Sequence, residues 1–126
     1  MTRQALQPDG LFTPKPPYSQ VVVSGDLVLT AGQVGFGEDG VLVAGGIVEQ
    51  TRQALENLSA CLAAAGCGPE DVLKVNAFLL DLGDFEGYNA VYREFFEPPY
   101  PARTTVGVAL PGGILVEIEA VARRPA

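Results

Sequence analysis

The chain has no histidine, no tryptophan and only two cysteines. Without histidine, imidazole is excluded as a general base and as a metal ligand, so Asp and Glu must carry any acid and base chemistry. Cys61 and Cys67 are too few for a disulfide scaffold, and no further Cys or His completes a zinc pattern. Residues 35–37 lack the Lys and the strand-to-helix context of a phosphate loop. We therefore expect neither a metal ion nor a cofactor.

Basic residues are also scarce, because 8 Lys and Arg face 15 Asp and Glu, which gives a net charge of -7 and a pI near 4.4. Affinity for nucleic acid depends on Lys and Arg that neutralise phosphates, so RNA is not an expected partner. No apolar run is long enough to span a membrane, and the N-terminus lacks the apolar core of a signal peptide. The sequence therefore predicts a cytoplasmic protein with no membrane partner.

The length and hydropathy of the chain indicate a small domain that associates. The 126 residues suffice for one hydrophobic core, so residues 1–126 are expected to form a single domain. A mean hydropathy of +0.22 is high for so small a chain and suggests more apolar surface than one core can hide. We therefore expect an oligomer.

Hydrophobic periodicity predicts strands and helices in alternation. After a proline-rich arm over 1–17 with a short strand at 3–6, strands are expected at 21–23, 27–34 and 72–80. A helix is expected from Gly46 to a stop at Gly66, and a second helix from an N-cap at Asp84 to before Pro98. The residues expected to face inward are Ile47, Thr51, Leu55, Leu58, Leu62 and Ala65 in the first helix, Leu73, Val75, Ala77 and Leu79 in the strand, and Phe85, Tyr88, Tyr92 and Phe95 in the second helix. This order predicts an α+β fold, with both helices on one face of one mixed sheet.

The stretch 101–122 places charges on otherwise apolar strands. Its two arms flank a turn cluster at 110–113, which is typical of a hairpin. Alternation puts Glu117 on the face opposite Ile118, and Arg103 on the same face as Thr105. A guanidinium can bind a carboxylate through two parallel hydrogen bonds, and a nearby carboxylate can hold or deprotonate a water. The alternative is a structural Arg to Glu pair across strands that closes a barrel or an interface, which the spacing favours equally.

Six pieces of the chain, in this order, carry a resemblance to a known family. They are Pro17-Tyr18-Ser19-Gln20, Thr30-Ala31-Gly32-Gln33, Ala54-Leu55-Glu56-Asn57-Leu58, Tyr88-Asn89-Ala90-Val91-Tyr92, Pro101-Ala102-Arg103-Thr104-Thr105-Val106 and Val116-Glu117-Ile118-Glu119-Ala120. Over nearly its whole length the chain resembles the RidA family, also called the YjgF family. The resemblance implies a chorismate-mutase-like fold and a homotrimer with active sites between subunits. It also implies hydrolysis of 2-imino acids such as 2-iminobutanoate and 2-iminopropanoate to 2-keto acids and ammonia.

The resemblance also implies roles for individual residues. Arg103 matches the arginine that binds the substrate carboxylate, and Glu117 matches the glutamate that positions the attacking water. The residues that it assigns to substrate binding beside Arg103 are Tyr18, Ala31, Asn89 and Thr105. Ala31 stands where many members have Ser, and Thr105 stands where several have Cys. Loss of a hydroxyl at Ala31 bears on substrate choice and rate more than on carboxylate binding.

Three alternatives stay open at this point. The first is a pathway-specific relative that deaminates or binds a different unsaturated amine, such as an aminomuconate or aminoacrylate, which Ala31 and the loop over 35–46 keep open. A second alternative is a non-catalytic protein that binds small carboxylates. A third is the endoribonuclease activity with which some relatives are labelled, although the acidic pI and the lack of histidine make it the weakest.

Overall fold

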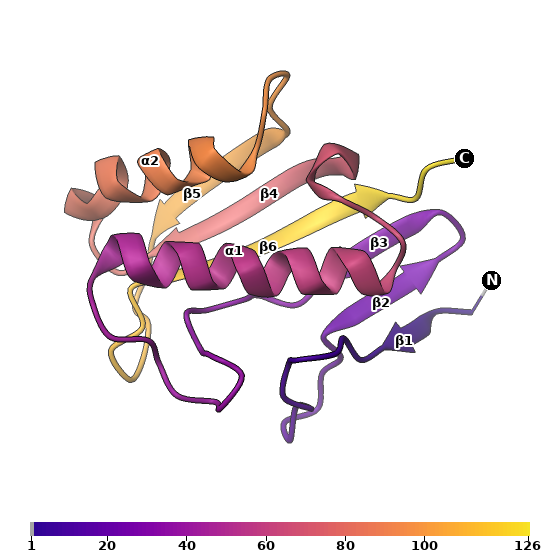
Figure 1. Cartoon of the computed structure of the whole chain (residues 1–126), viewed down its shortest axis with the longest axis horizontal. Helices are drawn as coiled ribbons and strands as arrows, with labels where there is room; N and C mark the ends of the chain where they lie inside the picture. Colours follow the sequence, from indigo (N-terminus) through magenta and orange to yellow (C-terminus); the bar gives the residue numbers. More distant parts are fainter. Residues whose placement is uncertain (1) are drawn as a thin grey trace.

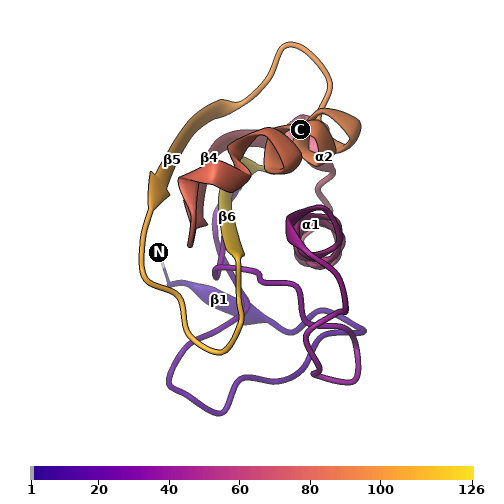
Figure 2. The same ribbon diagram turned by 90° about the vertical axis from the view of Figure 1, so that its left-hand side faces the viewer.

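The computed structural model describes residues 2–126 and contains one six-stranded sheet with both helices on one of its faces (Figures 1 and 2). The strands are β1 (Gln4–Leu6), β2 (Val21–Ser24), β3 (Leu27–Thr30), β4 (Val72–Leu79), β5 (Ala102–Gly107) and β6 (Val116–Arg123), and the helices are α1 (Ile47–Ala64) and α2 (Phe85–Phe95). The order across the sheet is β1-β2-β3-β6-β4-β5, and only the β4–β5 pair is parallel. The predicted α+β fold with a mixed sheet is confirmed.

The core lies between the sheet and the helices, and strict alternation on β6 shows how the sequence builds it. Val116, Ile118 and Ala120 are buried on the side of the helices, while Glu117 and Glu119 are only half-buried on the opposite side. Because side chains alternate across a strand, this pattern fixes the carboxylate of Glu117 on the face away from the helices. The faces that the sequence predicted for this strand are confirmed.

Helix α1 follows its sequence pattern closely. Thr51, Leu55, Leu58, Leu62 and Ala65 are buried, as their spacing predicted, and Ile47 is partly buried. At the N-terminus, Oε1 of Glu49 accepts a hydrogen bond from the amide of Gly46 at 2.8 Å. At the C-terminus, Gly66 has a φ of +77°, and the next amide, that of Cys67, donates to the carbonyl of Leu62 at 2.8 Å. This is the Schellman arrangement, and a glycine adopts its left-handed residue at no steric cost.

The start of α2 differs from the prediction. Asp84 precedes the helix, but its side chain caps no amide. Asp81 does this work one turn earlier, because its Oδ1 accepts from the amide of Gly83 at 2.8 Å and begins the short 3-10 turn Leu82–Asp84. Of the predicted inward stripe, Tyr88 and Tyr92 are buried, whereas Phe85 and Phe95 are only partly so.

One residue of the face predicted for β4 lies elsewhere. Val75, Ala77 and Leu79 are fully buried, but Leu73 is 47% exposed and Val72 is buried in its place. The register with β6 shifts between Val72 and Lys74, so an extra residue interrupts the alternation there. A bulge moves every side chain before it by one position, which a strict period of two cannot anticipate.

The predicted hairpin over 101–122 is wrong, because its two arms are not neighbours in the sheet. β5 pairs only with β4, and β6 lies on the other side of β4, between β4 and β3. Residues 108–115 connect the two arms, which is longer than the usual loop of two to five residues in a hairpin and passes the end of β4. Alternation assigns side chains to faces but does not identify the neighbouring strand.

Strand β3 also ends earlier than predicted. The ladder stops at Thr30, whose Oγ1 accepts a hydrogen bond from the amide of Ala120 at 3.1 Å. It resumes at Gln33, which exchanges two backbone hydrogen bonds with Ile118 at 2.8 and 2.9 Å. Ala31 and Gly32 therefore lie in a break of the strand, directly beside β6.

The sheet face away from the helices is uncovered and partly apolar. Leu27, Leu29 and Val106 point to this side, and between 37% and 43% of each is exposed. An uncovered sheet face that carries exposed apolar side chains typically marks a contact with another chain. In the described part of the chain, residues 2–126, we find no helix with the length and apolar character needed to cross a membrane.

Candidate functional site

The guanidinium of Arg103 is held against helix α2 at the edge of the sheet. Arg103 lies on β5, the outermost strand, and its Nη1 donates a hydrogen bond to Oδ1 of Asn89 at 2.8 Å. Its Cζ lies 4.7 Å from the ring centroid of Tyr92, 5.2 Å from that of Tyr88 and 5.7 Å from that of Phe85. Contacts with three aromatic rings fix the plane of the guanidinium of Arg103, so the side chain loses less conformational entropy when it binds a ligand.

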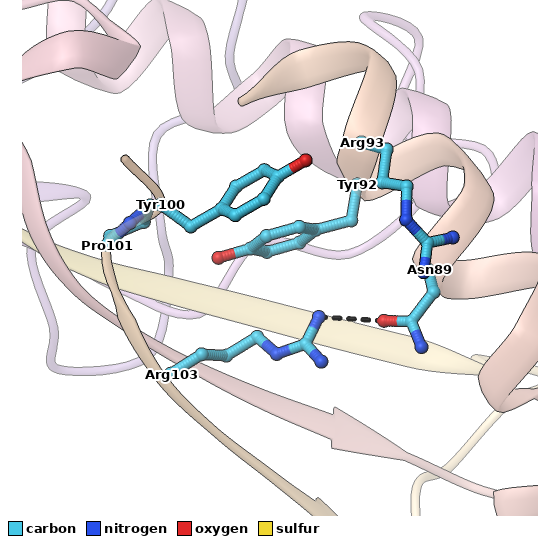
Figure 3. Close-up of a pocket in the computed structure, with 6 residues that line it drawn as sticks. All are labelled: Asn89, Tyr92, Arg93, Tyr100, Pro101 and Arg103. Carbon is cyan, nitrogen blue, oxygen red and sulfur yellow. Dashed lines mark hydrogen bonds between the residues drawn. The ribbon is translucent and has the colours of Figure 1, made fainter. Parts of the chain in front are cut away.

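A cavity opens beside this guanidinium (Figure 3). Its volume is about 240 Å³, and its lining residues are Asn89, Tyr92, Arg93, Tyr100, Pro101 and Arg103. A guanidinium has five N–H donors, so the single bond to Asn89 leaves donors for a ligand in the cavity. The volume is below the usual 300–1,000 Å³ of drug-sized ligands, which suits a small acid.

Thr105 lies two residues along β5 from Arg103 and on the same face. Its Oγ1 is 3.2 Å from the hydroxyl of Tyr88, and this hydrogen bond ties the strand to α2. Burial raises the pKa of Tyr88, so its hydroxyl stays protonated at neutral pH. The Thr105 side chain is therefore engaged within the fold and does not line the cavity of Arg103.

Glu117 lies in a second cavity. This cavity has a volume of about 170 Å³ and is lined in part by Tyr18, Gly32, Phe36 and Glu117. Burial, and secondarily the charge of Glu119, raises the pKa of Glu117 above the ordinary carboxyl value of 4.5. Burial, and secondarily the charge of Glu117, raises the pKa of Tyr18, so the two side chains interact electrostatically.

Gly32 makes room for Glu117. A Cβ at Gly32 would stand only 2.5 Å from Oε2 of Glu117 and 2.7 Å from its Cδ, so any larger residue must displace the carboxylate. Ala31, next to it, donates its amide to the carbonyl of Gln20 at 2.9 Å and does not line this cavity. Glu119, two residues along β6, accepts a hydrogen bond from Asn76 of β4 at 3.4 Å, so it engages a strand neighbour.

Three amide side chains that sequence reasoning missed shape the cavity of Glu117. Nε2 of buried Gln33 donates to Oε1 of buried Gln20 at 2.8 Å. Asn57 of α1 donates to the carbonyls of Val34 at 3.0 Å and Phe36 at 2.8 Å, which fixes the following loop to the helix. All three amide residues lie inside sequence pieces that resemble the RidA family. Their position in those pieces is the feature of the sequence that could have identified them.

The predicted site residues therefore form two separate groups within one chain. Arg103, Asn89 and Thr105 lie on the side of α2, whereas Glu117 and Tyr18 gather around the break in β3. Among residues 2–126, the ion pairs are Arg52 to Glu94 and Arg123 to Asp26, as the two salt-bridge distances of 3.2 and 3.4 Å show. Arg103 thus forms no structural pair with a Glu within residues 2–126 of one chain, and a pair that closes an interface between chains stays a prediction.

Nothing in residues 2–126 groups three or more His, Cys, Asp or Glu side chains closely enough to hold a metal ion. Both cysteines are free and buried, and burial raises the pKa of Cys61 to about 12. A thiol with that pKa stays protonated at neutral pH and is a poor nucleophile. Ionisable side chains that line the two cavities include Glu117 and Tyr18 in one and Arg103 and Arg93 in the other.

Replacing Gly32 with alanine should impair the site without unfolding the chain. The added methyl group displaces the carboxylate of Glu117, and a misplacement of about 1 Å at a reacting group costs up to about 10²-fold in rate. If the chain hydrolyses 2-imino acids, as the resemblance implies, we expect their turnover to fall by about that factor. Gly46→Ala is the matched control, because a Cβ there meets no atom within 4 Å. Equal turnover in Gly32→Ala and wild type would show that the position of Glu117 does not matter.

Comparisons with known proteins agree with this architecture. A family model described as Endoribonuclease L-PSP matches residues 11–124. The chain is 47% identical to a RutC family protein of Pyrococcus horikoshii, over 86% of this chain and 90% of that protein. It is 43% identical to the human protein named 2-iminobutanoate/2-iminopropanoate deaminase, over 84% of this chain and 79% of that protein.

A solved structure extends the likeness to the fold. The crystal structure of RidA from an Antarctic Psychrobacter superposes with a TM-score of 0.89 at 40% identity, and the match covers 95% of this chain and 98% of that one. Sequence and fold agree over nearly the whole described chain, including the strands that carry Arg103 and Glu117. The chain therefore belongs to the RidA family, whose members are also called YjgF proteins.

Proposed function

We propose that the chain hydrolyses 2-imino acids, such as 2-iminobutanoate and 2-iminopropanoate, to 2-keto acids and ammonia. The observation that carries this proposal is the guanidinium of Arg103, which Asn89 and three aromatic rings hold at the wall of a small cavity. A fork held in this way suits the carboxylate that every such substrate carries. Identity of 43% with a protein named for this reaction supports the same assignment.

The chemistry requires little beyond two correctly placed groups. Arg103 would bind the carboxylate, and Glu117 would take a proton from a water that attacks the imine carbon. The new C–O bond forms as the C=N electron pair moves to nitrogen, which is protonated and leaves as ammonia when the C=O bond forms. The raised pKa of Glu117 favours this role, because a carboxylate that binds protons more tightly is a stronger base.

We further propose a homotrimer in which each site combines residues of two neighbouring chains. Arg103 and Glu117 lie in different cavities of one chain, so a site that uses both needs a second chain. The uncovered sheet face supplies the contact surface, because Leu27, Leu29 and Val106 are exposed on it. In such an assembly Tyr18 would reach the substrate from the chain that contributes Glu117.

We expect light scattering at micromolar concentration to give about three times the chain mass of 13.2 kDa. Leu29→Lys should shift the protein toward monomer, because a charge on the uncovered face would lose its hydration on association. Val41→Lys is the matched control, since Val41 is 61% exposed but lies in a loop outside the sheet. A wild-type mass near that of one chain would contradict both the trimer and the shared site.

The activity is tested with an imine that a second enzyme generates in the assay mixture. A threonine dehydratase would generate 2-iminobutanoate, and release of the keto acid would be followed with and without this protein. Faster release supports the proposal. Binding of 2-oxobutanoate without faster release would instead indicate a carboxylate-binding protein, and acceleration only with aminoacrylate would indicate a relative with another substrate.

We do not propose RNA cleavage, because the net charge of -7 disfavours a phosphate-binding surface. Residence in the cytoplasm stays a prediction.

A further inference from the structure

A second arginine lines the cavity of Arg103. Arg93 lies on α2 four residues after Asn89, so the two side chains project from the same face of the helix toward the cavity (Figure 3). The six lining residues include two guanidinium groups and no carboxylate. The chain has only 8 Lys and Arg in all, so two arginines at one small cavity concentrate positive charge in an acidic protein.

Arg93 is not used by the fold. In residues 2–126 the only two ion pairs involve Arg52 and Arg123, and Arg93 is exposed and donates no side-chain hydrogen bond. Its neighbour Glu94 is already paired with Arg52 at 3.2 Å. Asn89 lies between the two arginines in Figure 3, and its Oδ1 accepts from Arg103. Within residues 2–126 its amide N–H groups donate no hydrogen bond, so they stay free for a ligand.

We propose that this cavity selects 2-imino acids with a second carboxylate, namely 2-imino dicarboxylic acids of four or five carbons. Arg103 would bind the carboxylate next to the imine, and Arg93, helped by the amide of Asn89, would bind the distal one. A dianion compensates two neighbouring guanidinium groups, whereas an alkyl side chain would leave Arg93 without a partner. The cavity volume of about 240 Å³ accommodates an acid of this size.

This inference rests on the proposed function for the reaction but not for the binding step. The reaction itself is unchanged, because water adds to the same imine carbon, ammonia leaves and the distal carboxylate stays intact. Arg93 is thus a specificity-determining residue. Its expected effect is on which acid binds, and it should leave the binding of monocarboxylates unchanged.

The test compares two stable keto acids of equal chain length by calorimetry, 2-oxoglutarate with two carboxylates and 2-oxopentanoate with one. We expect wild type to bind 2-oxoglutarate about tenfold more tightly. Arg93→Gln should lower the affinity for 2-oxoglutarate by about that factor. It should change the affinity for 2-oxopentanoate by less than about twofold. Arg3→Gln is the matched control, because Arg3 precedes β1 at the opposite edge of the sheet and its loss changes the net charge equally.

Equal affinity of wild type for the two acids would overturn the inference. The inference would also be overturned if Arg93→Gln lowered the affinity for both acids equally, or if Arg3→Gln had the same effect as Arg93→Gln. Either result would show that the net charge, and not the position of Arg93, determines binding. Turnover of the imines formed from glutamate and from 2-aminopentanoate by amino-acid oxidases separates this result from the proposed function. Hydrolysis of both at the same efficiency would contradict only the selectivity. Selective binding without any hydrolysis would contradict only the proposed reaction.

Discussion

Replacing Arg103 with lysine should lower the affinity for 2-oxobutanoate by about 10²-fold, as measured by calorimetry. Lysine keeps the charge but presents it as a point, so it cannot bind a carboxylate through two parallel hydrogen bonds. It also loses the planar contacts with Tyr88 and Tyr92, which lie 5.2 and 4.7 Å from the guanidinium carbon. Arg103→Lys therefore keeps the charge but removes the geometry that binds the carboxylate.

The control for Arg103→Lys is Arg3→Lys, which changes the same side chain outside both cavities. The melting temperature of Arg103→Lys should fall by a few degrees only, because the variant loses the hydrogen bond to Asn89 and the ring contacts but breaks no ion pair within residues 2–126. That of Arg3→Lys should match wild type. If Arg103→Lys binds the keto acid as tightly as wild type, the fork geometry is not what recognises the carboxylate.

Replacing Glu117 with glutamine should lower turnover of 2-iminobutanoate by about 10² to 10⁴-fold, with the affinity for 2-oxobutanoate nearly unchanged. Glutamine keeps the shape of the side chain beside Gly32 but cannot take a proton from water. In wild type, turnover should fall as pH decreases through the raised pKa of Glu117, which lies above 4.5. Separate measurements of kcat and KM over a range of pH values should show that the loss at low pH is in kcat.

Stability distinguishes a catalytic Glu117 from a structural one. Because its pKa is raised in the folded state, Glu117 favours the fold fully below the unfolded value of 4.5, and this contribution is lost as pH rises through the folded pKa. At neutral pH the ionised carboxylate thus costs stability, and Glu117→Gln should melt no lower than wild type. A large fall in melting temperature with parallel loss of ligand binding would make Glu117 structural. Unchanged turnover would remove it from the mechanism.

Much of the fold followed from local patterns in the sequence. The period of α1 identified five of its buried residues, Thr51, Leu55, Leu58, Leu62 and Ala65, but it missed the buried Gln50, Ala54 and Cys61. Gly66 identified the end of the helix, because a C-terminal cap depends on contacts within a few residues. The alternation on β6 placed Glu117 and Ile118 on opposite faces for the same reason. Local sequence determines which face a side chain occupies, and those predictions were correct.

Pairing between distant strands was not predictable in this way. The hairpin was wrong because β4, some thirty residues earlier in the chain, lies between β5 and β6, as the register of both pairs shows. Leu73 was misplaced because a bulge depends on the partner strand as well as on the residue itself. Long-range pairing also decides which groups meet, so spacing alone could not show that Arg103 and Glu117 occupy different cavities.

In the proposed trimer each site is formed jointly by two chains, and hybrid trimers test this most directly. Arg103→Lys and Glu117→Gln chains would be co-expressed with different tags and assayed together for hydrolysis of 2-iminobutanoate, at a substrate concentration low enough that each variant alone shows little activity. If one chain supplies Arg103 and its neighbour supplies Glu117, random assembly restores about a quarter of the sites. As a control, wild type co-expressed with the double variant should also give about a quarter, against about half for sites contained in one chain. No activity in the hybrids of the single variants, with half activity in that control, would contradict the shared site.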